Sequence, residues 1–301
     1  MNNHLLALLL IMVAALWGWT FVVVKDAIVV YGVVGFLAIR CTIGALVLGT
    51  ASARRINAGT LKIGLAIGVV LTGAYYLQTM GLKYTTSTKC GLITGLFVVF
   101  APLAARLLVG VKTRWLFWFA IAMSLTGLGL LTGTGPEPLA LGDLLTLGCA
   151  VLFGLHIALL ARYAREHDAV VLTFAQLSAA ALMFIVLWPA TEVIAWPSRG
   201  VWFALVITGV FASAVAFLVQ TFVQQRLPAA RTAVILSTEP VFAAIFGYLL
   251  HKDRLDSLQI IGAATMVAAI LLAEFSSNGR GKKEQGGQAR LLASGGDFDG
   301  L

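Results

Sequence analysis

The residues best placed for chemistry are a few ionisable side chains inside long apolar stretches. Glu239 lies about ten residues into the apolar stretch 230–250 and directly precedes Pro240. An ionisable group at the centre of a membrane-spanning helix costs roughly 3 kcal/mol to insert, so such a group is retained for a reason. The carboxylate could bind a substrate ammonium group or exchange protons. It could equally form a hydrogen bond across helices and fix a hinge, because proline removes a backbone donor.

His156, Arg40 and Arg106 are also ionisable and lie in apolar stretches. His156 could line a site, relay protons near neutral pH, or form a hydrogen bond with a neighbouring group. Arg40 could clamp a substrate carboxylate, or it could be structural, reaching the membrane interface or pairing with a polar neighbour. Arg106 is close to the end of its stretch and is expected to extend to the interface, without a role in a site.

Aromatic and amide side chains suit a cavity for a small organic molecule. Trp17, Tyr75 and Gln78 lie deep in their stretches, with Thr79 beside Gln78, and Gln220 occupies the matching depth later in the chain. Aromatic residues are also common at the two membrane interfaces, which is the alternative explanation for any one of them. The predicted substrate-binding residues are Trp17, Tyr75, Gln78, Thr79, His156, Gln220 and Glu239.

Composition requires a lipid environment for these residues. Hydrophobic residues make up 60% of the 301 residues and charged residues 11%, with a mean hydropathy of +0.95. Soluble domains carry about 25% charged residues. The net charge of +8 does not indicate nucleic-acid binding, because the basic residues are scattered between apolar stretches. The three cysteines have no metal-ligand spacing and are interpreted as packing residues, so neither a metal site nor a cofactor is predicted.

Ten stretches are long enough to span a bilayer, which takes about 20 apolar residues. The fold class is therefore predicted to be an all-α integral membrane protein with ten transmembrane helices. The N-terminal stretch lacks the basic start of a signal peptide and is expected to be retained. The predicted spans are 5–24, 33–51, 63–82, 87–109, 115–133, 143–162, 170–189, 201–222, 230–250 and 257–275.

The distribution of basic residues predicts the orientation. With the N-terminus inside, thirteen of the 21 Lys and Arg residues fall in inside segments and six in outside segments, and Arg40 and Arg106 lie within spans. Because inside loops carry the excess of positive charge, both termini are predicted to be cytoplasmic. The segment 276–301 is rich in Gly, Ser and charge and is expected to be a disordered cytoplasmic tail.

An internal repeat divides the ten helices into two sets of five. The segment 14–18 matches 150–154 at an offset of 136, and Gln78-Thr79 matches Gln220-Thr221 at an offset of 142. Pro102 and Pro240 are expected to interrupt corresponding helices. Because five is odd, the second set enters the membrane from the opposite side, which makes the repeat inverted and places a site at the interface of the halves. The predicted halves are 1–136 and 137–275.

Several longer motifs resemble a known family. They are ALWGWTFVVVK (15–25), GLKYTTSTKCGLITGLFVVFAPL (81–103), GDLLTLGCAVLFGLHIALLARYA (142–164), ARTAVILSTEPVFAAIFGYLL (230–250) and QIIGAATMVAAILL (259–272). The chain resembles the ten-helix EamA type of the drug/metabolite transporter superfamily over residues 5 to 275, and is most similar to the YddG-like amino-acid exporters. It departs from many members at His251-Lys252-Asp253, where they have a Glu.

The resemblance implies a secondary transporter rather than an enzyme, since members move amino acids, other metabolites or cationic drugs. The expected function is export of a small organic solute, with aromatic or other amino acids as the first expectation, by alternating access in a plasma-membrane monomer. No nucleotide-binding motif is present, so transport is expected to be facilitative or proton-linked. A drug carrier is the main alternative. A channel would need rings of like groups, and a membrane-embedded enzyme would need a dyad or metal set.

Overall fold

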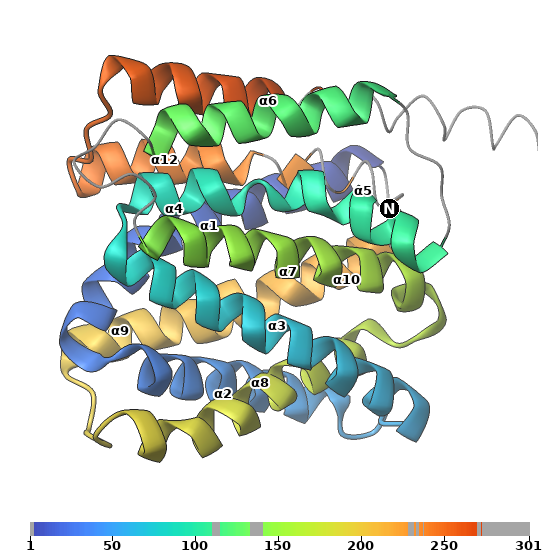
Figure 1. Ribbon diagram of the computed structural model, residues 1–301. Coiled ribbons are helices and arrows are strands. Elements are labelled where there is room, and N and C mark those ends of the chain that lie inside the picture. Colours follow the sequence, from blue (N-terminus) through green and yellow to red (C-terminus); the bar gives the residue numbers. More distant parts are fainter. Residues whose placement is uncertain are drawn as a thin grey trace, which may run out of the picture.

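Apolar stretches become helices in this chain because lipid offers no partner to a backbone N–H or C=O, and a helix satisfies both internally. The computed structural model describes residues 3–109, 115–132, 141–227 and 238–269, together with Thr232, Ile235, Leu236 and Leu272. Within these residues the chain forms helices and no strand. The helices lie side by side along one direction, with α6 and the helix 257–269 at one edge and α2 and α8 at the opposite edge (Figure 1).

The helices follow one another with short connections. They are α1 (Asn3–Tyr31), α2 (Val33–Ser52), α3 (Ala58–Tyr84), α4 (Ser87–Thr94), α5 (Phe97–Val109), α6 (Trp115–Thr132), α7 (Leu141–Tyr163), the 3-10 turn η1 (Ala164–Glu166), α8 (Ala169–Thr191), α9 (Arg199–Val206), the π-helix η2 (Ile207–Val215), α10 (Ala216–Gln224) and α12 (Glu239–Leu250). A further apolar helix covers Ser257–Ala269.

Seven of the helical segments are long and apolar enough to cross a bilayer, which confirms a multi-pass membrane protein. They are His4–Tyr31, Val33–Ser52, Ala58–Tyr84, Ser87–Leu108, Leu141–Glu166, Ala169–Thr191 and Arg199–Gln224. At the other three predicted spans the apolar helical segments are shorter: Ile121–Leu131, which is part of α6, Glu239–Leu250 and Ser257–Ala269. The count of ten therefore stays a prediction, since parts of these three spans, and the tail 276–301, lie outside the described residues.

The two prolines predicted to interrupt helices behave differently from each other. Pro102 lies inside α5, which continues past it, so that prediction is wrong. The break in this span comes earlier, at Gly95 and Leu96 between α4 and α5. Pro240 does mark a helix end, because α12 begins at Glu239 with the proline in its first turn, where a missing N–H costs nothing. Glu239 is thus at the start of a helix rather than ten residues into one.

Two helix pairs approach each other so closely that only glycine fits. A Cβ atom on Gly18 of α1 would lie 2.6 Å from Cβ of Phe242 and 2.8 Å from the backbone nitrogen of Ala243 in α12. A Cβ atom on Gly154 of α7 would lie 2.6 Å from Cβ of Phe100 in α5 and 2.9 Å from the next backbone nitrogen. Small residues permit such approaches in lipid, where packing rather than water exclusion holds helices together.

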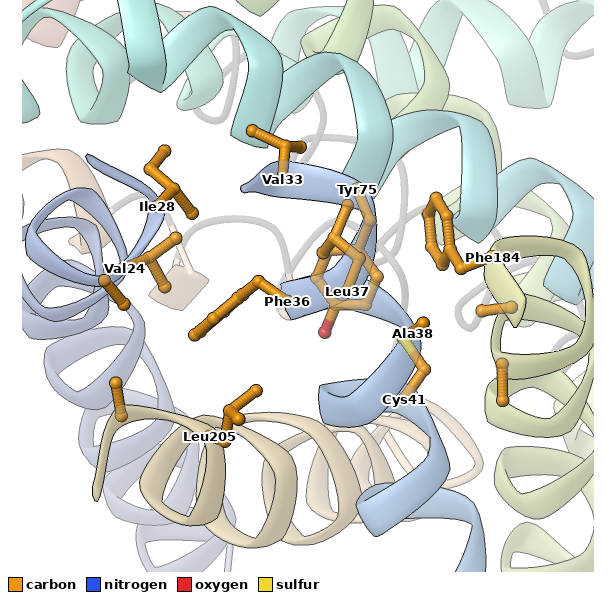
Figure 2. Packing of buried hydrophobic residues seen from close by; sticks show 14 of the residues in the cluster. Val24, Ile28, Val33, Phe36, Leu37, Ala38, Cys41, Tyr75, Phe184 and Leu205 are labelled. Carbon is orange, nitrogen blue, oxygen red and sulfur yellow. The ribbon is translucent and has the colours of Figure 1, made fainter. Parts of the chain in front are cut away.

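The interior between α1, α2, α3, α8 and α9 is filled by large apolar side chains. Figure 2 shows Phe36 of α2 directed toward Val24 and Ile28 of α1, with Leu205 of α9 beneath them. Cys41 belongs to the same cluster, and Cys90 and Cys149 are also fully buried, with exposed fractions of 0%. Their burial agrees with the interpretation of the cysteines as packing residues.

A carboxylate that follows α8 caps the start of α2. Glu192, which follows α8, accepts hydrogen bonds from the backbone N–H groups of Val33, Val34 and Gly35 at 2.9, 3.1 and 2.9 Å. The turn before α2 passes through Gly32 with φ of +95°, and a Cβ atom there would lie 2.6 Å from the Glu192 carboxylate. The cap satisfies three of the N–H groups that a helix start leaves without partners.

Replacement of Glu192 by alanine is expected to destabilise the protein by about 1–3 kcal/mol, because these donors lose their acceptor. The measurement is the midpoint of thermal unfolding in detergent, followed by fluorescence-detected size exclusion. Glu192→Gln keeps one acceptor oxygen and should fall between the wild type and the alanine variant. Thr191→Val removes an exposed hydroxyl that bonds only to its own helix and serves as the control. Equal midpoints for Glu192→Ala and Thr191→Val would contradict the capping role.

The same end of the bundle carries a second polar connection between distant segments. His251, just after α12, has Nε2 2.9 Å from Asp26 Oδ1 of α1 and Nδ1 3.0 Å from Ser87 Oγ at the start of α4. Asp253 accepts from the backbone N–H of Thr88 at 2.9 Å. The segment after α12 therefore ties α1 and α4 together at this end of the molecule.

Candidate functional site

A cavity lies between helices of the N-terminal and C-terminal parts of the described chain, with about 610 Å³ of space free of protein atoms, part of which is open to solvent. Its walls come from α1, α2, α7, α10, the C-terminal part of α3 and the start of α12, with the α4–α5 break alongside. The lining residues are Trp17, Thr20, Phe21, Val24, Arg40, Tyr75, Gln78, Thr79, Leu82, Thr94, Phe97, Phe153, Ile157, Phe217, Gln220, Leu236 and Glu239.

Six of the seven predicted substrate-binding residues line this cavity. They are Trp17, Tyr75, Gln78, Thr79, Gln220 and Glu239. His156, the seventh, is fully buried and does not belong to the lining. The structure thus brings six candidates together around one space, and their role in binding remains a prediction.

Four aromatic rings form one wall of the cavity. The ring centroids of Trp17 and Phe217 are 5.1 Å apart, those of Tyr75 and Phe153 are 6.2 Å apart, and Tyr75 and Phe217 are 5.8 Å apart with their planes at 75°. These distances and tilted planes are those that aromatic pairs prefer. The wall offers an apolar aromatic surface to a solute side chain.

Arg40 brings a positive charge to the cavity without a carboxylate partner. Its Nε donates to Ser213 Oγ at 2.9 Å and its Nη2 donates to the Tyr75 hydroxyl at 3.1 Å, while the guanidinium carbon lies 4.5 Å from the centre of the Tyr75 ring. Within the part of the chain that the structure describes, no acidic group lies within ion-pair distance of Arg40. The Arg40 side chain is buried and bonds to polar neighbours. This is the structural alternative that the sequence analysis gave beside the clamp for a substrate carboxylate.

Glu239 brings a carboxylate to the same cavity. It lies in the first turn of α12 and is 4% exposed. The start of a helix carries a partial positive charge, which favours a carboxylate there. Among the described residues no hydrogen bond reaches its side chain. The cavity therefore contains one cation and one carboxylate that are not paired with each other.

The two glutamines of the cavity, Gln78 and Gln220, form hydrogen bonds with different helices. Gln78 Nε2 lies 3.5 Å from Thr94 Oγ1 of α4. Gln220 Nε2 donates to Gln224 Oε1 at 3.2 Å, and Gln224 Nε2 donates to the Ile157 carbonyl at 3.3 Å. Both glutamines line the cavity, and within the described chain they do not bond to each other. The Oε1 atom of Gln220 is buried without a partner, which leaves an acceptor for a solute donor.

His156 lies behind the aromatic wall. Its Nε2 is 2.6 Å from Gln176 Oε1, and its ring meets the edge of Phe217 with centroids 5.7 Å apart. Because Gln176 Nε2 donates to the Leu172 carbonyl, Gln176 Oε1 is the acceptor and His156 Nε2 carries the proton. Nδ1 then faces the interior without a partner. His156 is separated from the cavity by one aromatic ring.

Several lining residues were not among the predicted ones. Phe153 could have been found, because it matches Trp17 in the predicted internal repeat. Phe217, Thr94 and Phe97 carry no signal of their own in an apolar sequence. Ser213 does not line the cavity but holds Arg40, and only the structure shows it.

No metal centre accompanies the cavity in the described chain, where no three His, Cys, Asp or Glu residues lie close enough together to hold an ion. The fold and this site define a multi-pass membrane protein with a cavity between its helices that is lined by polar and aromatic side chains. The chain belongs to the EamA-like transporter family, which matches residues 5–133 and 140–275. It is therefore a membrane transporter.

Curated relatives agree with this assignment, and a solved structure shares the fold. The chain is 31% identical over 266 residues to an uncharacterized transporter from Archaeoglobus fulgidus, covering 88% of this chain and 84% of that one. It is 22% identical to the uncharacterized transporter YoaV from Bacillus subtilis, over 90% and 97% of the two chains. A crystal structure that is 21% identical shares the fold with a TM-score of 0.66, over 89% of this chain and 96% of that chain.

Proposed function

We propose that this transporter exports amino acids, with aromatic ones among its substrates. The observation that carries the proposal is the presence of two opposite charges, Arg40 and Glu239, in one cavity with an aromatic wall. A free amino acid is a zwitterion, and its carboxylate and ammonium group would each find a partner of opposite charge. The lone acceptor of Gln220 adds a second site for the ammonium group.

The main alternative is a carrier of cationic drugs. Glu239 and the aromatic rings suit an organic cation as well, since cations bind to both carboxylates and ring faces. Arg40 argues against it, because a second positive charge in a low-dielectric cavity would repel the solute.

Alternating access between two inverted halves, residues 1–136 and 137–275, is the proposed mechanism. Gly18 and Gly154 correspond at an offset of 136, and the residues they approach, Phe242 and Phe100, correspond at 142. The ring pairs follow the same offsets, since Trp17 with Phe217 matches Phe153 with Tyr75. Matching contacts of this kind are expected if the halves are related by a twofold axis in the membrane plane.

The location and assembly follow from the same proposal. We expect a plasma-membrane monomer with both termini in the cytoplasm. The excess of basic residues in the predicted inside segments supports this orientation. No second copy is needed to complete the cavity, because a single chain supplies all of its described walls.

The test is transport in proteoliposomes with three related solutes: L-phenylalanine, phenethylamine, which lacks the carboxylate, and 3-phenylpropionate, which lacks the ammonium group. L-Phenylalanine is expected to move faster than either analogue by about tenfold or more, because each lost charged hydrogen bond costs about 1.5–3 kcal/mol. Preference for phenethylamine would support the cationic carrier instead, and no movement of L-phenylalanine would contradict the amino-acid proposal. Repeating the assay with an imposed pH gradient distinguishes proton-linked from facilitative transport.

A further inference from the structure

The helical span that lines the cavity with Phe217 and Gln220 is not a regular α-helix. Between α9 and α10 the nine residues Ile207–Val215 form the π-helix η2, in the middle of the span Arg199–Gln224. A π-helix bonds each residue to the fifth one along and is less stable than an α-helix, so it is rare and usually limited to one turn. A stretch of this length must be held by contacts from outside it.

Those contacts come from three residues of the cavity wall. Trp17 Nε1 of α1 donates to the Ala212 carbonyl at 2.8 Å. Arg40 Nε of α2 donates to Ser213 Oγ at 2.9 Å, and the Tyr75 hydroxyl of α3 lies 3.2 Å from the same oxygen. Trp17, Arg40 and Tyr75 all line the cavity. The π-helix is therefore fastened by groups that a solute in the cavity would also contact.

The corresponding part of the first half is a continuous α-helix with one residue fewer. A Cβ atom on Gly68 of α3 would meet the Gln176 carbonyl and Ala179, and a Cβ atom on Gly209 would meet the Arg40 carbonyl and Ile43. Both of these partner pairs correspond at the offset of 136, which makes Gly68 and Gly209 equivalent, at an offset of 141. Gln78 and Gln220 are equivalent at 142.

One extra residue is thus present between Gly209 and Gln220, and η2 is where the helix accommodates it. The π-helical turn that accommodates the extra residue can form at different points along a helix. When this turn shifts past a given residue, the side chain of that residue rotates by about 100° around the helix axis, the angle between successive positions. Phe217 and Gln220 follow η2 directly, so the position of the π-helical turn decides whether they face the cavity.

We propose that η2 is the joint at which α10 turns on α9 during transport, and that Trp17 and Arg40 hold it in the π form while the cavity is empty. A solute that accepts hydrogen bonds from Trp17 and Arg40 breaks their bonds to Ala212 and Ser213. The position of the extra residue then moves along the helix. Ser213 and Trp17 act as positioning residues for Phe217 and Gln220. This inference rests on the proposed transport through the cavity.

The first test removes the extra residue. Deletion of Phe211, an exposed residue of η2, is expected to give a continuous α-helix in a folded protein whose L-phenylalanine transport falls on the order of tenfold or more, because the moving step is lost. The matched control is deletion of Val69, an exposed residue in the regular part of α3. This variant should not fold, because α3 has no extra residue and the deletion turns one part of the helix by about 100° away from its contacts. Wild-type transport by the Phe211 deletion would overturn the proposal.

The second test needs no solute and does not depend on the Phe211 deletion being folded. Trp17→Phe removes one contact to η2, and Ser213→Ala removes two, those with Arg40 and Tyr75. Both variants are expected to increase amide hydrogen exchange in peptides covering 205–219 but not in those covering 64–78. Thr72→Val is the control, since the Thr72 hydroxyl bonds to the Gly68 carbonyl of its own helix. Unchanged exchange in both variants would overturn the joint. If exchange rises but L-phenylalanine is not carried, the joint stands and the amino-acid proposal fails.

Discussion

Replacing Glu239 with glutamine is expected to reduce L-phenylalanine transport at low substrate concentration by about 10- to 150-fold, the equivalent of the ~1.5–3 kcal/mol of a hydrogen bond to a charged group. The carboxylate is buried in the cavity wall with no partner among the described residues, so a solute ammonium group would supply its first strong interaction. The amide has nearly the same shape and no charge, which separates the loss of charge from the loss of packing. Initial rates in proteoliposomes measure the effect.

The matched control is Glu166→Gln, which changes an exposed carboxylate in the turn η1, away from the cavity. It should transport at the wild-type rate. If Glu239→Gln retains wild-type rates as well, Glu239 does not bind the solute, and its role is confined to the start of α12. A loss for phenethylamine equal to that for L-phenylalanine would show that the carboxylate recognises the ammonium group alone.

Alanine at Gly18 or at Gly154 is expected to destabilise the protein by about 1–3 kcal/mol in each case, as added volume in a tightly packed interior does. The new methyl group would meet backbone atoms of α12 or α5, which cannot move without shifting a whole helix. The midpoint of thermal unfolding in detergent measures the effect. Because the two glycines make corresponding contacts, their variants should lose similar amounts of stability.

Gly129→Ala provides the control for this pair. A Cβ atom at Gly129 in α6 would meet nothing within 4 Å. Alanine there should stabilise the helix by roughly 0.5–1 kcal/mol, because glycine loses more conformational freedom on folding. A neutral Gly154→Ala beside a damaging Gly18→Ala would count against the equivalence of the two halves.

The membrane class and most helix positions could be predicted from composition and length alone, since 20 apolar residues have few other stable conformations. Helix ends and breaks could be predicted only in part. Pro240 marks a helix end as predicted, but Pro102, which was expected to interrupt a helix, lies inside α5. The helix breaks instead at Gly95, where a Cβ atom would collide with Pro240 of α12. That contact joins residues far apart in sequence, and the sequence near Gly95 does not predict it.

The cavity residues were predictable where their type is unusual in lipid, as for Glu239, Gln78 and Gln220. The direction in which a side chain points was not predictable. Lipid and the protein interior are both apolar, so the periodicity that marks the buried face of a helix in a soluble protein is absent. His156 therefore could not be told apart from a lining residue, although it lies behind Phe217. The only trace of the π-helix in the sequence is that the offset of the repeat changes by one residue between Gly209 and Gln220. This change can be interpreted only when the contacts of Gly68 and Gly209 are known.

The complete burial of Cys41, Cys90 and Cys149 gives the natural chain a practical advantage for mapping its orientation. Thiol reagents attack the accessible thiolate, and these three side chains are 0% exposed. A single cysteine introduced at Val193, beside the start of α2, or at Arg55, just beyond its end, would be the only reactive thiol. A membrane-impermeant maleimide added to intact cells should label the first position and spare the second, if both termini lie in the cytoplasm.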